Sequence, residues 1–149
     1  MTIQELTHIA CMDILAENQD MHLSEQEKKQ NTVAEVLVKC LENEGVKYVF
    51  GIPGEENLDM MNALEKSDIR VIVVRHEQGA AFMADMYGRL TGIAGVCFST
   101  LGPGATNLIT GTADANSDGA PLIAITGQEG TERMHMTSHQ YLDLVELFA

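Results

Sequence analysis

Basic residues are scarce in this chain of 149 residues. Nine lysines and arginines stand against 22 aspartates and glutamates, which gives a formal net charge of −13. A nucleic-acid-binding protein needs a basic patch, and so does a protein that docks on an anionic membrane surface. The acidic balance therefore argues against nucleic acid and against a membrane surface as partners.

Long hydrophobic runs are also missing. The longest apolar stretches cover only a few residues, whereas a membrane-spanning helix needs about 20. The amino-terminal stretch MTIQELTHIACMDILAENQD lacks both the basic start and the continuous apolar segment of a secretory signal. We therefore expect a soluble protein with no membrane span.

Cysteine and histidine are too few and too scattered for a disulfide framework or a metal site. Cys11, Cys40 and Cys97 are odd in number, far apart and without a CxxC pair, which favours a reducing, cytoplasmic location. His135 and His139 have a spacing that can bind metal, but no zincin glutamate lies between them and no third ligand is nearby. We expect no metal ligand in this chain.

The hydrophobic content of 45% fits one compact domain with a sizeable core. Residues 1–31 combine apolar residues at roughly helical spacing with a polar run, which indicates an amino-terminal extension and linker without a chemical role. The domain itself is expected over 32–149. A helical pattern over 141–149 ends without a cap, a glycine or a closing strand, so we expect the domain to be incomplete.

From residue 32 onward, helical and extended patterns alternate. A capping box, Thr32-x-x-Glu35, opens the first helix, and its apolar face is predicted as Val33, Val36, Leu37, Cys40 and Leu41. Strands are expected at 48–50, 69–74, 95–100 and 122–126, with helices around 58–64, 78–90 and 104–116. This order predicts an α/β fold with an open parallel sheet and helices on both faces.

Ligands bind such sheets beyond the carboxyl ends of the strands, and every unusual loop falls at that edge: 51–54, 75–77, 100–104 and 127–139. Glu77 lies three residues after the end of the apolar run 71–74, which is expected to be a buried strand. The simplest role for Glu77 is to complement the dipole of the next helix, which stabilises by about 0.3–1 kcal/mol. The turns at 51–54 and 100–107, taken alone, fit a ligand loop or a tight packing turn equally well.

Taken in order, these motifs form a far more specific combination: F-G-I-P-G, R-H-E-Q-G-A-A-F-M-A-D-x-Y-G-R-x-T-G, S-T-x-G-P-G-A-T-N, P-L-I-A-I-T-G-Q and S-H-Q. The combination resembles the N-terminal, pyrimidine-binding domain of thiamine-diphosphate enzymes, and most closely the acetolactate synthase large subunits. The resemblance runs from about Thr32 to the end of the chain.

The resemblance implies a role for each matching residue. Glu77 would hydrogen-bond N1′ of the cofactor's aminopyrimidine and so promote removal of the proton from C2 of its thiazolium. Gln140 would reach the reaction centre as a second catalytic residue. The cofactor-binding residues would be Pro53, Gly54, Glu77, Thr100, Pro103 and Asn107.

The resemblance also implies the reaction and the partners. Two 2-oxo acids such as pyruvate would condense with decarboxylation, as in branched-chain amino acid biosynthesis, in a homodimeric or tetrameric full-length enzyme. Mg²⁺ would be held by a second domain whose G-D-G…N motif is absent here, so we expect the isolated chain to be inactive. FAD is a further cofactor that the resemblance allows, and its usual anchors belong to a middle domain.

Two departures leave the substrate open, since Glu55 and His139 differ from the residues common in biosynthetic members. Two alternatives also stay open at this point. The chain could belong to another thiamine-diphosphate decarboxylase or oxidase of 2-oxo acids, or it could be a stand-alone binding module without catalysis.

Overall fold

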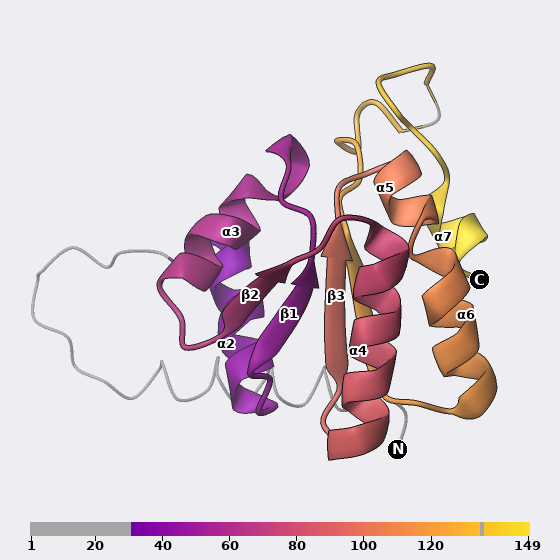
Figure 1. Ribbon diagram of the computed structural model, residues 1–149. Helices are drawn as coiled ribbons and strands as arrows, with labels where there is room; N and C mark the ends of the chain where they lie inside the picture. The colour runs from indigo at the N-terminus through magenta and orange to yellow at the C-terminus, as the bar shows by residue number, and fades with distance from the viewer. Residues whose placement is uncertain (1–30, 135) are drawn as a thin grey trace, which may run out of the picture.

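The computed structural model describes residues 31–134 and 136–149. Four parallel strands form one sheet in the order β2-β1-β3-β4, namely β1 (Tyr48–Gly51), β2 (Arg70–Val73), β3 (Gly95–Ser99) and β4 (Leu122–Thr126). Helices α2 (Val33–Asn43) and α3 (Leu58–Glu65) cover one face, and α4 (Glu77–Thr91) and α6 (Ile109–Asp118) cover the other (Figure 1). The predicted α/β fold with helices on both faces is confirmed. Residues 1–30 of the predicted amino-terminal extension and linker lie outside the described residues, and so does His135, which is not expected to be a metal ligand.

Two apolar cores lie on opposite faces of the sheet because successive strand residues point to opposite sides. Val49, Val96 and Phe98 face α2 and α3, and all three are fully buried. Phe50 and Cys97, which neighbour them in sequence, point to the other face. There they pack in one cluster with Ala80, Ala81 and Ala84 of α4 and with Leu108. The central strands β1 and β3 therefore connect both halves of the hydrophobic interior.

The small residues of α4 let this helix lie unusually close to its neighbours. A Cβ atom on Gly95 of β3 would lie 1.8 Å from the backbone oxygen of Ala84, and one on Gly88 would lie 2.3 Å from the carbonyl oxygen of Pro121. Neither approach leaves room for a side chain, so these glycines fix the depth at which α4 sits on the sheet.

Two predictions about burial are wrong, the first of them in part. Val38 and Leu41 are the buried residues of α2, whereas Val33 is 87% exposed and Val36 and Leu37 are 36% and 37% exposed. Leu41 of the predicted apolar face is thus buried, but α2 packs through Leu41 together with Val38, which was not predicted. The strand after Ile69 is not buried on both faces either, because β2 is an edge strand and its Val73 is 63% exposed.

The helix expected over 104–116 is divided in two. A short helix α5 (Pro103–Thr106) precedes α6, and the N–H of Leu108 donates to Ala105 O only three residues back, at 3.0 Å. This tighter turn redirects the chain at Asn107. At the carboxyl end, the helical pattern forms only α7 (Leu144–Leu147), and a single 3₁₀ turn (Glu55–Asn57) precedes α3.

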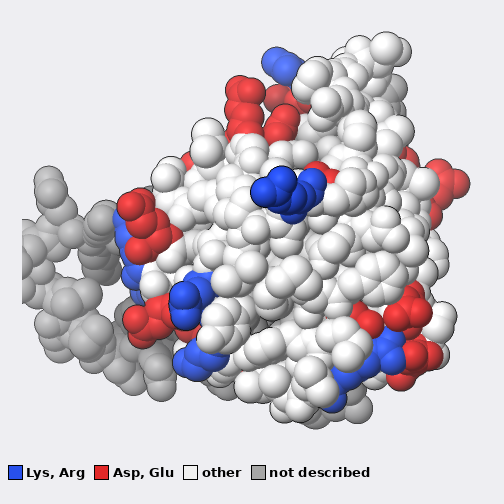
Figure 2. Space-filling view, viewed as in Figure 1, with Lys and Arg blue, Asp and Glu red and all other residues white. Residues whose placement is uncertain are grey.

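Charged side chains are unevenly distributed over the surface. Figure 2 shows that the face over α4 is largely free of them, with acidic residues gathered towards its periphery. Met83, Met86 and Leu90 are exposed residues of α4. In the described part of the chain, no helix is both long and apolar enough to cross a membrane.

Candidate functional site

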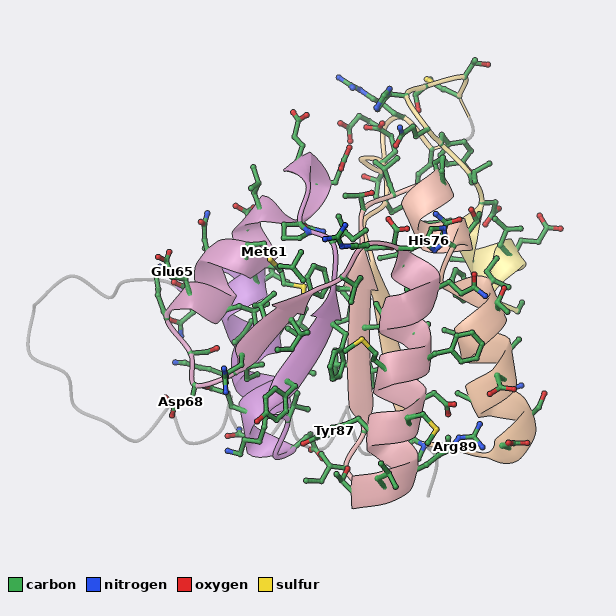
Figure 3. The ribbon with its side chains drawn as sticks, in the orientation of Figure 1. Met61, Glu65, Asp68, His76, Tyr87 and Arg89 are labelled. Carbon is green, nitrogen blue, oxygen red and sulfur yellow. The ribbon has the colours of Figure 1, made fainter. Side chains whose placement is uncertain are left out.

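The start of α4 presents a carboxylate at the carboxyl edge of the sheet. His76 caps this helix, because its Nδ1 accepts a hydrogen bond from the backbone N–H of Gln78 at 3.2 Å. His76 stands at the upper end of α4 in Figure 3. The next residue, Glu77, is therefore not needed as the cap, and its side chain is free to make a different contact.

That contact comes from the joint between α5 and α6. Nδ2 of Asn107 donates a hydrogen bond to Oε2 of Glu77 at 2.9 Å, in a partly buried environment. Within residues 31–134 and 136–149, the other carboxylate oxygen, Oε1, has no hydrogen-bond partner. One oxygen is thus held by the protein while the other remains available.

Thr100 and Glu77 border the same small space, which Gly104 keeps open. A Cβ atom on Gly104 would lie 2.6 Å from Oγ1 of Thr100 and 3.5 Å from Oε1 of Glu77. Glycine thus leaves room beside the free carboxylate oxygen. Pro103 stands at the first position of α5, and its carbonyl oxygen accepts from the N–H of Asn107 at 3.1 Å. Pro103 therefore helps to orient the residue that holds Glu77.

The turn after β1 reaches the same place. A Cβ atom on Gly54 would lie 2.3 Å from Cγ2 of Thr100, so the two loops are in direct contact. The turn is braced by the buried Asn57, whose Oδ1 accepts from Gly54 N at 2.9 Å and whose Nδ2 donates to Ile52 O at 3.2 Å. Pro53 itself is exposed. The predicted meeting of the 51–54, 75–77 and 100–104 loops at one edge is confirmed.

The backbone of Gln140 lies against the loop at Gly102, at this same edge of the sheet. A Cβ atom on Gly102 would lie 2.3 Å from Gln140 O. Gln140 also has a φ of 52°, and no other non-glycine residue of the described chain has a positive φ. Such a conformation is uncommon and costs conformational energy. Gln140 is exposed, and its side chain makes no hydrogen bond to another described residue.

A hollow lies between β4 and α7, and Glu77 is not among its lining residues. Its walls are Ala124, Thr126, Gln128, Leu144, Val145 and Phe148. None of these side chains is a carboxylate, histidine, lysine or cysteine, so the hollow offers no side chain that could act as a general acid or base near neutral pH. In the described ranges, histidine, cysteine, aspartate and glutamate form no group of three that could hold a metal ion.

Comparison with known proteins identifies the family. The family model described as "Thiamine pyrophosphate enzyme, N-terminal TPP binding domain" matches residues 31–147. This chain belongs to that family.

Similar curated proteins carry acetolactate synthase names. The probable acetolactate synthase large subunit of Methanocaldococcus jannaschii is 50% identical over 115 residues, which cover 77% of this chain and 20% of that protein. The catabolic acetolactate synthase of Raoultella terrigena is 47% identical over 116 residues, or 78% of this chain and 21% of that protein. The acetolactate synthase of Bacillus subtilis is 46% identical over 119 residues, or 80% and 21%. This thiamine pyrophosphate domain therefore spans about a fifth of the length of these relatives.

The residues around Glu77 fit the pyrimidine end of thiamine pyrophosphate. A ring nitrogen that shares a proton needs a fixed carboxylate with one free oxygen, and Glu77 is held through Oε2 with Oε1 unpartnered. A flat ring needs close backbone approach, and Gly54 and Gly104 leave that room beside Thr100. The diphosphate end needs a cation, and the described residues contain no cluster that fits one.

Sequence reasoning missed His76 and Asn57. His76 is the helix cap, although histidine is not among the preferred N-cap residues. Asn57 follows the turn glycine Gly54 by three residues, a spacing at which an asparagine side chain can accept from the turn backbone. The signal for Asn57 was thus present in the sequence.

Proposed function

We propose that this chain supplies the pyrimidine-binding part of the cofactor site in an acetolactate synthase-like carboligase. The observation that carries the proposal is the arrangement of Glu77, which is held through Oε2 by Asn107 and leaves Oε1 beside the space at Gly104. The family match over 31–147 and the acetolactate synthase names of the relatives support the same conclusion.

In this proposal, Glu77 would share a proton with a pyrimidine ring nitrogen of the cofactor through its unpartnered oxygen, Oε1. Asn107 orients the carboxylate so that its free oxygen points to that nitrogen, and Gly54, Thr100 and Pro103 form the wall beside the ring, with Pro53 next to it. Gln140 is assigned to the reaction centre on the strength of the S-H-Q motif. When bound, thiamine diphosphate supplies a thiazolium carbon that adds to a 2-oxo acid and accepts the electrons released on decarboxylation.

We further propose pyruvate, or another 2-oxo acid, as the substrate, and the cytoplasm as the location. Mg²⁺ would be bound outside this chain together with the diphosphate. The assembled enzyme would be a homodimer or tetramer, and any FAD would be bound by another part of that enzyme. The acetolactate synthase names of the relatives support the choice of a 2-oxo acid substrate.

A chimera tests this function. Residues 31–147 replace the matching segment of the Methanocaldococcus jannaschii large subunit, which is 50% identical over 115 residues. With pyruvate, thiamine diphosphate and Mg²⁺, we expect the chimera to form acetolactate and the 149-residue chain alone to form none. Formation of acetaldehyde in place of acetolactate would favour a decarboxylase. A folded chimera that binds the cofactor but shows no turnover would contradict the proposal.

A further inference from the structure

Helices α4 and α6 meet along a seam whose contacts recur roughly one helical turn apart. The two helices lie side by side in Figure 1 and pack against each other. Glu77 and Asn107 are hydrogen-bonded at the upper end, and the next pair along the seam is Ala81 and Gly111. Each member of this second pair follows its counterpart by four residues, about one helical turn, with Asn107 at the joint between α5 and α6 and Gly111 within α6.

The lower end of the seam is held by ionic contacts. Arg89 of α4 reaches Asp114 at 3.1 Å and also contacts Asp118, both on α6. Its Nε lies 2.8 Å from Oδ1 of the buried Asp85. Figure 3 shows Arg89 at the end of α4 opposite His76. The hydrogen bonds to Asp85 and Asp118 raise the pKa of Arg89 above its ordinary value, so its charge is permanent.

Gly111 is a glycine for reasons of space. It lies inside α6 without a positive φ, so its backbone conformation does not require glycine. A Cβ atom there would lie 2.5 Å from Cβ of Ala81 and 3.0 Å from both Ala81 C and Phe82 N. Two of these three atoms belong to the backbone, so no rotation of a side chain can relieve the overlap. An added methyl group must push α6 away from α4.

We propose that Gly111 is a positioning residue for Glu77, because it sets the helix separation at which Asn107 reaches the carboxylate. The ionic contacts of Arg89 hold the lower end of the seam, so the displacement falls on the upper end. There a single hydrogen bond of 2.9 Å joins the start of α4 to Asn107, at the joint that leads into α6, and a lengthening of about 0.6 Å takes it out of hydrogen-bonding range. This inference rests on the proposed function of Glu77, for which misplacement by about 1 Å can cost about 10²-fold in rate.

Nuclear magnetic resonance on the full 149-residue chain tests the inference without cofactor. The side-chain amide protons of Asn107 report the hydrogen bond, because their chemical shift follows the ionisation of Glu77 as pH is varied. In Gly111→Ala we expect this pH response to shrink several-fold. The matched control is Gly79→Ala, which adds a methyl group to α4 where nothing lies within 4 Å, and it should leave the response unchanged.

A second variant keeps the test decisive if Gly111→Ala does not fold. In the double variant Ala81→Gly/Gly111→Ala, the 2.5 Å overlap with Ala81 Cβ is removed and the two backbone contacts at 3.0 Å remain, so we expect the Asn107 response to return in part. A folded Gly111→Ala with an unchanged response would overturn the inference, and so would a folded double variant that restores none of the response. Because no cofactor or turnover is involved, failure of this test is distinct from failure of the proposed catalytic function, which the chimera reports.

Discussion

The hydrogen bond between Asn107 and Glu77 can be measured as a coupling free energy. Asn107→Ala removes the Nδ2 donor, which lies 2.9 Å from the carboxylate, and leaves Glu77 without a described partner. Hydrogen bonds to charged groups contribute about 1.5–3 kcal/mol. Glu77 is only partly buried, and water can replace part of the lost contact, so we expect a coupling of about 1–2 kcal/mol.

The assay is a double-mutant cycle by urea unfolding of the 149-residue chain. The four proteins are the wild type, Asn107→Ala, Glu77→Ala and the double variant, and the free energy of unfolding of each gives the coupling. Alanine also has a better helix propensity than asparagine, by up to about 0.7 kcal/mol, but this difference cancels in the cycle. Purely additive losses, with a coupling near zero, would refute the reasoning that Asn107 holds Glu77.

Two further predictions concern other parts of the fold. Burial raises the pKa of the Cys97 thiol to about 12, whereas a thiol in an unfolded chain titrates near 8.5. The unfolded state therefore loses the thiol proton first, and the free energy of unfolding falls as pH rises from about 9 towards 12. Thermal midpoints measured between about pH 8 and 10.5 should fall more steeply in the wild type than in Cys97→Ala, and parallel slopes would contradict this. Asn57→Ala removes both hydrogen bonds that brace the turn at Gly54 and should lower the free energy of unfolding by about 1–3 kcal/mol. The exposed Asn62→Ala on α3 serves as the matched control, and an equal effect of both variants would contradict the bracing role.

Local signals in the sequence predicted most of the secondary structure. The capping box is present, with Glu35 N donating to Thr32 Oγ1 at 3.2 Å and Thr32 N donating to Glu35 Oε2 at 3.0 Å. The alternation of strands and helices placed the glycine-containing loops at one sheet edge, because parallel strands end together. These features depend on neighbours within a few residues, and such neighbours are visible in a sequence.

The errors concern contacts between distant segments. The edge position of β2 depends on strand order, which the apolar run 71–74 does not encode, and this is why Val73 is exposed. The buried stripe of α2 depends on where α3 and the sheet lie. Asn107 was predicted to border the cofactor pocket, and that role remains a proposal. Its hydrogen bond to Glu77, 30 residues away in sequence, needed the structure.

The most direct test of the central claim is the exchange rate of the C2 proton of thiamine diphosphate bound to the chimera, compared between the wild type and Glu77→Gln. Glutamine is nearly isosteric and removes at most about 1 kcal/mol of helix-dipole stabilisation, so the thermal midpoint should hardly change. Positioned proton transfer commonly contributes 10²–10⁴-fold, and we expect C2 exchange to slow by about that factor. Unaltered exchange together with a lower midpoint would contradict the account, because Glu77 would then only stabilise the start of α4.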